Sequence, residues 1–163
     1  MHADSLVTVQ TGSIQIQPLQ IRDVFSVYRL EKRCFPIDSW PFFDVFLAVV
    51  FPRIIRLKAV AGERLIGFVM GERERGTGWI ATFGVDPDFR RQGIGTELLG
   101  AVENLLDTDV IRLCVRVSNE AAIRLYERSG YVSVDTWKRY YRGGEDALVM
   151  EKYLAGERPV SAR

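Results

Sequence analysis

A short run of arginines and glycines in this 163-residue chain has the composition of a phosphate-binding turn. A strand-like segment, 79–85, is followed by an Asp-Pro-Asp turn and then by Arg90-Arg91-Gln92-Gly93-Ile94-Gly95-Thr96, which leads into helical apolar spacing. Glycines at a helix start let an anion approach unpaired backbone N–H groups at the positive end of the helix dipole. The two arginines add positive charge there. The segment therefore predicts a pyrophosphate cradle, and hence a nucleotide-bearing cofactor.

The spacing of the glycines narrows the choice of cofactor. A P-loop would need a lysine directly after its second glycine, and no lysine follows either glycine here. A dinucleotide-binding fingerprint read from Gly93 would place its third glycine at position 98, which is a leucine. Taken alone, the pattern could also be a glycine-relaxed helix start with no ligand.

A second motif, 117–131, follows a buried-strand pattern. Ser118 and Asn119 suit the N-cap of a helix there, and Gly130 suits its end. Together with Arg90-x-x-Gly93-x-Gly95, this motif resembles the GCN5-related N-acetyltransferases, the GNAT family. The resemblance implies acetyl-CoA as the cofactor and an acetyl group moved to an amine.

The resemblance also implies roles for individual residues. Backbone amides of the glycine turn would bind the pyrophosphate, Asn119 would hydrogen-bond the cofactor arm, and the arm would pair with the bulged strand segment 83–85. Gly84 suits a bulge or a close backbone approach there, or marks a simple strand irregularity. Tyr126 would protonate the departing thiolate; read alone, it could be a core tyrosine. The implied cofactor contacts are Phe83, Gly84, Val85, Arg90, Arg91, Gln92, Gly93, Ile94, Gly95, Thr96 and Asn119.

Two segments that contain aromatic residues indicate which class of amine accepts the acetyl group. Phe35-Pro36-Ile37 separates two helical patterns, and Tyr140-Tyr141 precedes a Gly-Gly turn. This pairing resembles the branch of the family that acetylates protein N-termini, including the ribosomal-protein alanine enzymes. There the first segment lines an apolar pocket for the first side chain, and the tyrosines hold the peptide backbone, whose polar groups recur whatever the side chains. Core packing of the first segment, and an exposed loop pair for the tyrosines, are the alternatives.

One position departs from the family pattern. Cys114 stands where the resemblance leads us to expect a proton-accepting glutamate or histidine. The amine must lose a proton before attack, and at pH 7 roughly 14% of an α-amine but only about 0.04% of a lysine amine is neutral. A site without a strong base therefore favours an α-amine. We expect water to take the proton, aided by Glu31, Glu72 or Tyr140, and Cys114 to be structural, because burial raises a thiol pKa.

The elements needed to position these residues alternate in a single-domain α/β (α+β) pattern. The resemblance implies the GNAT fold, a mixed, mostly antiparallel sheet with splayed central strands flanked by helices. We expect the domain to span 13–154, with flexible termini at 1–12 and 155–163. Strand patterns lie at 13–17, 54–61, 65–73, 79–85, 111–117, 131–137 and 147–153, and helical patterns lie at 19–32, 41–51, 94–106 and 120–129.

Composition fits a compact cytoplasmic enzyme, 47% apolar, with a net charge of +1 that gives no sign of nucleic-acid binding. Two cysteines are too few for a disulfide framework, and the only histidine, His2, lies near the N-terminus, so we expect no metal site. No apolar run approaches the roughly 18 residues of a membrane span, and no signal peptide is evident. The oligomeric state stays open between monomer and homodimer.

Two other functions share the cofactor motifs. A small-molecule acetyltransferase for polyamines or aminoglycoside antibiotics would need an acidic acceptor pocket, whereas the candidate acceptor segments are apolar and aromatic. A non-catalytic CoA-binding sensor would explain the missing carboxylate, but the presence of Tyr126 argues against it. The protein or peptide N-terminus is therefore the preferred acceptor.

Overall fold

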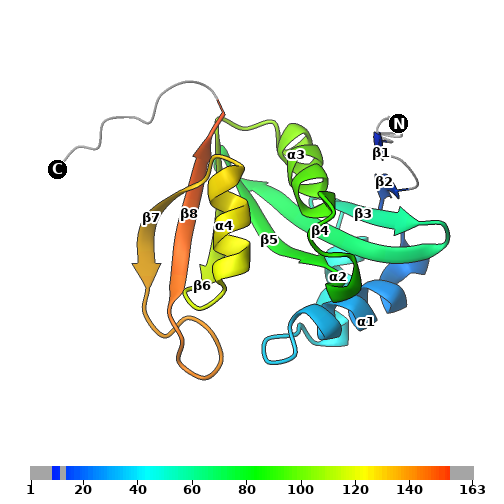
Figure 1. The fold of residues 1–163 in the computed structure, drawn as a ribbon, viewed down its shortest axis with the longest axis horizontal. Helices are drawn as coiled ribbons and strands as arrows, with labels where there is room; N and C mark the ends of the chain where they lie inside the picture. The colour runs from blue at the N-terminus through cyan, green and yellow to red at the C-terminus, as the bar shows by residue number, and fades with distance from the viewer. Residues whose placement is uncertain (1–8, 12–13, 155–163) are drawn as a thin grey trace.

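The computed structural model describes residues 9–11 and 14–154, which build a mixed sheet with helices on both faces (Figure 1). The strands are β1 (Val9–Thr11), β2 (Ile14–Pro18), β3 (Ile55–Ala61), β4 (Arg64–Glu74), β5 (Thr77–Val85), β6 (Val110–Arg116), β7 (Val132–Trp137) and β8 (Ala147–Tyr153). The helices are α1 (Val24–Cys34), α2 (Phe42–Val50), α3 (Ile94–Leu106) and α4 (Glu120–Arg128), with 3₁₀ turns η1 (Ile21–Asp23) and η2 (Pro87–Phe89). The strand order is β1-β2-β3-β4-β5-β6-β8-β7.

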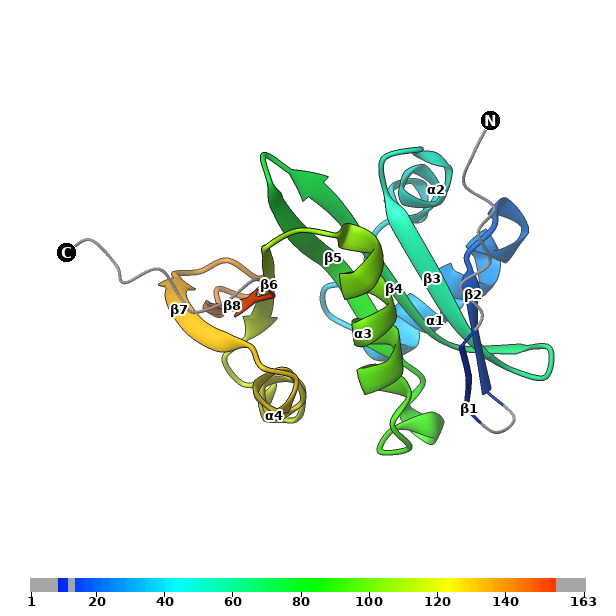
Figure 2. The ribbon, with the colours of Figure 1, turned by 90° about the horizontal axis from the view of Figure 1, so that it is seen from above.

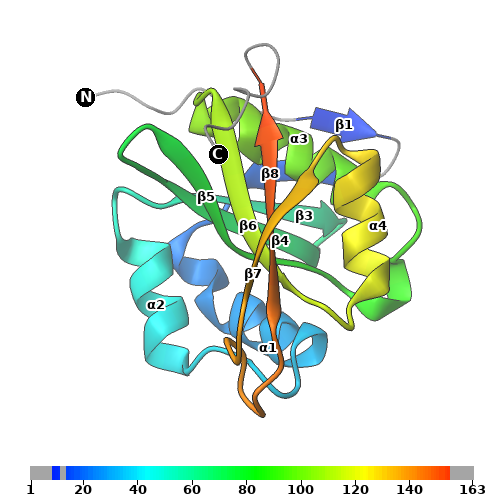
Figure 3. The same ribbon diagram turned by 90° about the vertical axis from the view of Figure 1, so that its left-hand side faces the viewer.

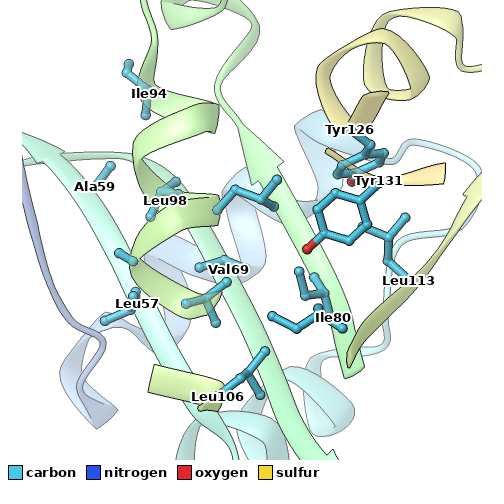
Figure 4. Packing of buried hydrophobic residues seen from close by; sticks show 14 of the residues in the cluster. Leu57, Ala59, Val69, Ile80, Ile94, Leu98, Leu106, Leu113, Tyr126 and Tyr131 are labelled. Carbon is cyan, nitrogen blue, oxygen red and sulfur yellow. The ribbon is translucent and has the colours of Figure 1, made fainter. Parts of the chain in front are cut away.

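Two apolar clusters cover the two faces of the sheet. Helices α3 and α4 lie on one face and α1 and α2 on the other (Figure 2). On the first face, Leu98 and Leu106 of α3 pack with Leu57, Val69 and Ile80 from three neighbouring strands (Figure 4). The helical spacing of the α3 leucines puts them on one side, and burial of each such side chain contributes about 1.5–3 kcal/mol. The resulting layer fixes α3 over the middle of the sheet.

The central strands β5 and β6 separate along their length. Their parallel pairing joins 77–80 to 110–113 and stops there, while β6 stays paired with β8 over 110–116. Residues 81–85 of β5 therefore have no strand neighbour on the β6 side, and the two halves of the sheet diverge in Figure 1. The predicted splayed central strands are confirmed.

The bulge in β5 lies at a different residue from the one we expected. The pairing with β4 shifts between Met70 and Gly71, which face Thr82 and Ile80, so Ala81 is the extra residue. An extra residue inverts the alternation of side chains beyond it. The prediction of a bulge at Gly84 is therefore wrong, and this glycine instead leaves room for neighbouring side chains, as described below.

The N-terminal edge of the sheet begins earlier than the sequence analysis proposed. Val9–Thr11 pairs antiparallel with Ile14–Ile16, although we expected residues 1–12 to be a flexible leader. The rest of the predicted leader and the predicted flexible tail, 155–163, lie outside the described residues. None of the helices within the described ranges combines the length and hydropathy needed to cross a membrane.

Candidate functional site

The glycine turn presents a row of unpaired backbone donors at the start of α3. Gly93 is the N-cap residue with φ of 83°, and the first bond of the helix runs from the Glu97 N–H to the Gly93 carbonyl, 3.1 Å. Arg91 also has a positive φ, 61°. Among the described residues, no hydrogen bond uses the N–H groups of residues 91–96. These unpaired donors lie at the positive end of the helix, where an anion can bind.

The two glycines of the turn have different surroundings. A Cβ added to Gly93 would meet nothing within 4 Å, so the space beside it is open. A Cβ added to Gly95 would lie 3.1 Å from the Leu125 Cδ2 and 3.3 Å from the Phe83 Cζ. Gly95 therefore lets α3 pack closely against α4 and β5, whereas Gly93 supplies the left-handed backbone and keeps the turn accessible.

A buried carboxylate holds the Asp86-Pro87-Asp88 turn, which precedes the glycine turn, in place. The Asp86 side chain is 2% exposed and accepts hydrogen bonds from Arg33 and Arg64, each at 2.9 Å, and from the Asp88 N–H at 3.1 Å. Nearby, the Arg90 Nε donates to the Val85 carbonyl at 3.1 Å. Part of the positive charge that we expected to face phosphate is thus turned back toward β5. Of the two arginines, only Arg91 has a side chain with no bond to a described residue.

The open edge of β5 faces the divergence between β5 and β6. The Asp86 N–H bonds to the Ile66 carbonyl of β4, at 2.8 Å. In an antiparallel ladder such residues alternate, so Gly84 also points its backbone groups to β4, while Phe83 and Val85 point theirs toward β6. The Val85 carbonyl is taken by the Arg90 bond. The Val85 N–H has no hydrogen-bond partner in the described part of the chain, so it could polarise a carbonyl oxygen.

Gly84 lies against helix α1. A Cβ there would come within 3.0 Å of both the Cys34 Sγ and the Phe68 ring. The absence of a side chain thus lets the Cys34 and Phe68 side chains pack against the strand, while the close backbone approach that we expected at this glycine stays a prediction.

Helix α4 carries the two residues assigned to cofactor chemistry. The Asn119 Oδ1 caps the helix by accepting from the Ala122 N–H at 3.2 Å, and its Nδ2 has no bond to a described residue. The Tyr126 ring is 6% exposed and lies between Phe83 and Tyr131, with centroid distances of 6.1 and 5.8 Å. Figure 4 shows the two tyrosines side by side beneath α4. The hydroxyl of Tyr126 has no partner among the described residues, and burial raises its pKa.

The loops around the divergence carry the predicted acceptor residues. The α1–α2 loop (35–41) places Phe35 against the second apolar cluster but leaves the Ile37 side chain 66% exposed, and Pro36 is also exposed. In the β7–β8 loop (138–146), the rings of Tyr140 and Tyr141 meet edge to face at 5.0 Å. Figure 3 shows the two loops at the same end of the molecule.

Arg116, at the end of β6, joins these two loops. Its Nε donates to the Asp38 Oδ2 at 2.6 Å, and its guanidinium also pairs with Glu145. The same guanidinium lies over the Tyr141 ring, 4.6 Å from the centroid. Sequence reasoning missed Arg116 and Asp38, since they are 78 positions apart and no local pattern links them.

The comparison with known proteins decides the family. A family model described as the acetyltransferase (GNAT) family matches residues 24–131. The chain belongs to this family. It is an acetyl-CoA-dependent N-acetyltransferase with the predicted fold and cofactor.

Several relatives are similar over much of this GNAT enzyme. The [ribosomal protein bS18]-alanine N-acetyltransferase of Salmonella typhimurium is 32% identical, covering 83% of this chain and 94% of the relative. The N-terminal acetyltransferase B complex catalytic subunit NAA20 of Arabidopsis thaliana is 36% identical, covering 58% of this chain and 59% of its own. Among solved structures, the ribosomal-protein-S18-alanine N-acetyltransferase from Escherichia coli superimposes with a TM-score of 0.80 at 25% identity, covering 92% and 99% of the two chains.

Cys114 occupies the β6 position where the resemblance led us to expect a proton-accepting side chain. Cys114 is half-buried, and burial raises the pKa of its thiol, with Arg112 opposing the shift. The phenols of Tyr140 and Tyr141 lie near enough that a thiolate at Cys114 would raise the pKa of each, although burial is the larger cause. The neutral thiol that we predicted is therefore the favoured form.

The two carboxylates named as possible bases differ in their exposure to solvent. Glu31 is buried, and both of its oxygens lie 3.0 Å from the Trp40 N–H. Burial is the largest cause of its raised pKa, and the charge of Asp38 adds to it. Glu72 is exposed on β4, opposite Trp79. Within the part of the chain that the structure describes, no group of three or more histidine, cysteine or acidic side chains could hold a metal.

Proposed function

We propose that this enzyme acetylates the N-terminal α-amino group of a protein or peptide, by direct transfer in a ternary complex. The observation that carries the proposal is the meeting of the two acceptor loops through Arg116 at the open end of the sheet. These loops expose Ile37 and Tyr140, an apolar side chain and a phenol, as an extended peptide requires. Two relatives are named as a ribosomal-protein alanine N-acetyltransferase and an N-terminal acetyltransferase subunit, which supports the same acceptor class.

The free donors of the structure fit the shape and charge of acetyl-CoA. We infer that the N–H groups of residues 91–96 hold the pyrophosphate, together with the Arg91 guanidinium, and that Arg90 supports the turn from behind. The Asn119 Nδ2 and the free backbone edge of 83–85 would hold the arm. When bound, acetyl-CoA supplies an acetyl group activated as a thioester.

Two groups of this chain serve the transfer. The Val85 N–H stabilises the negative charge that develops on the carbonyl oxygen, since it is fixed in the strand before the reaction begins. Tyr126 donates its phenolic proton to the departing sulfur. Its raised pKa keeps that proton in place at neutral pH, and its ring is held by Phe83 and Tyr131.

The proton of the acceptor leaves by way of water. Glu31 is a poor candidate because its side chain is buried, away from the water that would carry the proton. Tyr140 and Glu72 are the exposed groups of the three that we named, and they can order the water that takes the proton. An α-amine suits such a site because a substantial fraction of it is already neutral at pH 7.

Replacing Gly93 with valine is expected to raise the Kd for acetyl-CoA about tenfold or more. A side chain would fill the open space of the turn, and the left-handed backbone would be strained. The measurement is calorimetric titration with acetyl-CoA. Gly62→Val is the matched control, because Gly62 also has a positive φ, 59°, with nothing within 4 Å, but lies in the β3–β4 turn. Equal affinities in the two variants would refute the cradle.

The proposed function is tested by comparing acceptors directly. A library of short peptides varying the first two residues is assayed beside spermidine and an aminoglycoside, with free coenzyme A as the measured product. We expect turnover with peptides that have a free α-amine and little with the small amines. Preference for a small amine would overturn the proposed acceptor, and no coenzyme A release with any amine would indicate a sensor.

A further inference from the structure

The Asp38 carboxylate, at the centre of the α1–α2 loop, has one oxygen with a partner and one without. Its Oδ2 accepts from Arg116. Its Oδ1 is shielded from solvent and has no hydrogen-bond partner among the described residues. A shielded carboxylate oxygen left without a donor is costly, and a structure tolerates it where a ligand supplies the donor.

Glu145 is the other carboxylate that pairs with Arg116, and both of its oxygens have partners. Its Oε2 pairs with Arg116, and its Oε1 accepts from the Ser118 N–H at 2.9 Å. The guanidinium also donates to the Arg142 carbonyl at 3.1 Å. Arg116 is therefore saturated by fixed partners, and the planar fork of an arginine holds both carboxylates in defined orientations. Asp38 Oδ1 is the oxygen of this group that is left for an incoming donor.

The location of Asp38 matches the place where an acceptor amine must arrive. Asp38 directly follows Ile37, the exposed apolar side chain of the α1–α2 loop. The Arg116 guanidinium that binds Asp38 also lies over the Tyr141 ring, 4.6 Å from its centroid. The carboxylate and the acceptor tyrosine therefore contact the same arginine, where the two acceptor loops meet.

We propose that Asp38 Oδ1 accepts a hydrogen bond from the acceptor's amino group and orients it for attack, with Arg116 as the positioning residue. This assignment rests on the proposed function, because it names the amine of a peptide N-terminus as the donor. Arg116 shares its single positive charge between Asp38 and Glu145, and we assign Asp38 the role of hydrogen-bond acceptor rather than that of the base. Water still removes the proton.

The substitution Asp38→Asn tests this assignment. An asparagine would keep its oxygen toward the Arg116 donors and present an N–H group where the amine needs an acceptor. The affinity for a substrate peptide should fall roughly 10- to 100-fold, the range for a hydrogen bond to a charged group. The Kd for acetyl-CoA should stay within about twofold of the wild-type value, which would show that the variant is folded.

The decisive readout compares a substrate peptide with its desamino analogue, which lacks only the N-terminal amine. Both affinities are measured with coenzyme A bound, in the wild type, in Asp38→Asn and in Glu145→Gln. The wild type should prefer the amine-bearing peptide, Asp38→Asn should lose that preference, and Glu145→Gln, which weakens the same arginine but leaves Asp38 in place, should keep it.

Each result of this comparison bears on a different proposal. An unchanged preference in Asp38→Asn would overturn the assignment of Asp38 while leaving the proposed function intact. An equal loss of preference in Glu145→Gln would also overturn it, because Asp38 would then act only as a loop anchor. If the wild type acetylated no peptide, the proposed function would fail first, and the amine partner named here would fail with it.

Discussion

Tyr126→Phe is expected to lower kcat by about 100- to 10,000-fold, the usual contribution of a positioned general acid, with the affinity for acetyl-CoA changed by no more than a few-fold. The ring contacts to Phe83 and Tyr131 do not involve the hydroxyl, so phenylalanine preserves the packing. The loss should therefore appear in single-turnover rates rather than in binding.

Tyr131→Phe is the matched control for that experiment. The Tyr131 hydroxyl donates to Glu103 at 2.9 Å in a buried group that also includes Lys152. Removing it should cost about 1–3 kcal/mol of folding stability, because a buried carboxylate oxygen loses its donor. It should affect kcat far less than Tyr126→Phe. A normal turnover rate in Tyr126→Phe would show that another group protonates the thiolate.

An α-amine is expected to be preferred over a lysine side chain by several-hundred-fold in kcat/KM at pH 7. The neutral fractions, roughly 14% and 0.04%, set this ratio when the site contains no strong base. The structure supports that condition, since the raised pKa of Cys114 keeps its thiol neutral and Glu31 is buried. The measurement uses two peptides of equal length, one with a free N-terminus and no lysine, the other N-acetylated with a single lysine.

The pH dependence of that ratio identifies its cause. At pH 9 the neutral fractions become roughly 94% and 4%, so the preference should shrink to about 25-fold. A preference that stays constant between the two pH values would point to selection by shape or to a protein base. In that case the account of the missing strand carboxylate would be wrong.

Local sequence patterns predicted most of the fold because each element carries its own signal. The apolar spacing from Ile94 to Leu106 gave α3 its observed bounds, and the capping residue Asn119 marked the start of α4. The bulge could not be placed from the sequence, since its position at Ala81 depends on which residues of β4 face which residues of β5. Pairing register is a property of two strands together.

The residues of the site also differ in whether a local sequence pattern could reveal them. The glycine turn and Tyr126 lie in contiguous motifs and could be named in advance. The Arg116 contacts join three segments far apart in the chain, with separations of 78 and 29 positions, so they depend on the tertiary fold. Asp86 shows the intermediate case: its place in an Asp-Pro-Asp turn was visible, but its two arginine partners came from α1 and β4.

A crystal structure with acetyl-CoA bound tests the central claim most directly, namely that main-chain donors at 91–96 hold the diphosphate so that the thioester lies beside Tyr126. The account predicts phosphate oxygens within hydrogen-bond distance of those N–H groups and the sulfur next to the Tyr126 hydroxyl. A diphosphate bound away from this turn, or a sulfur remote from that hydroxyl, would contradict it.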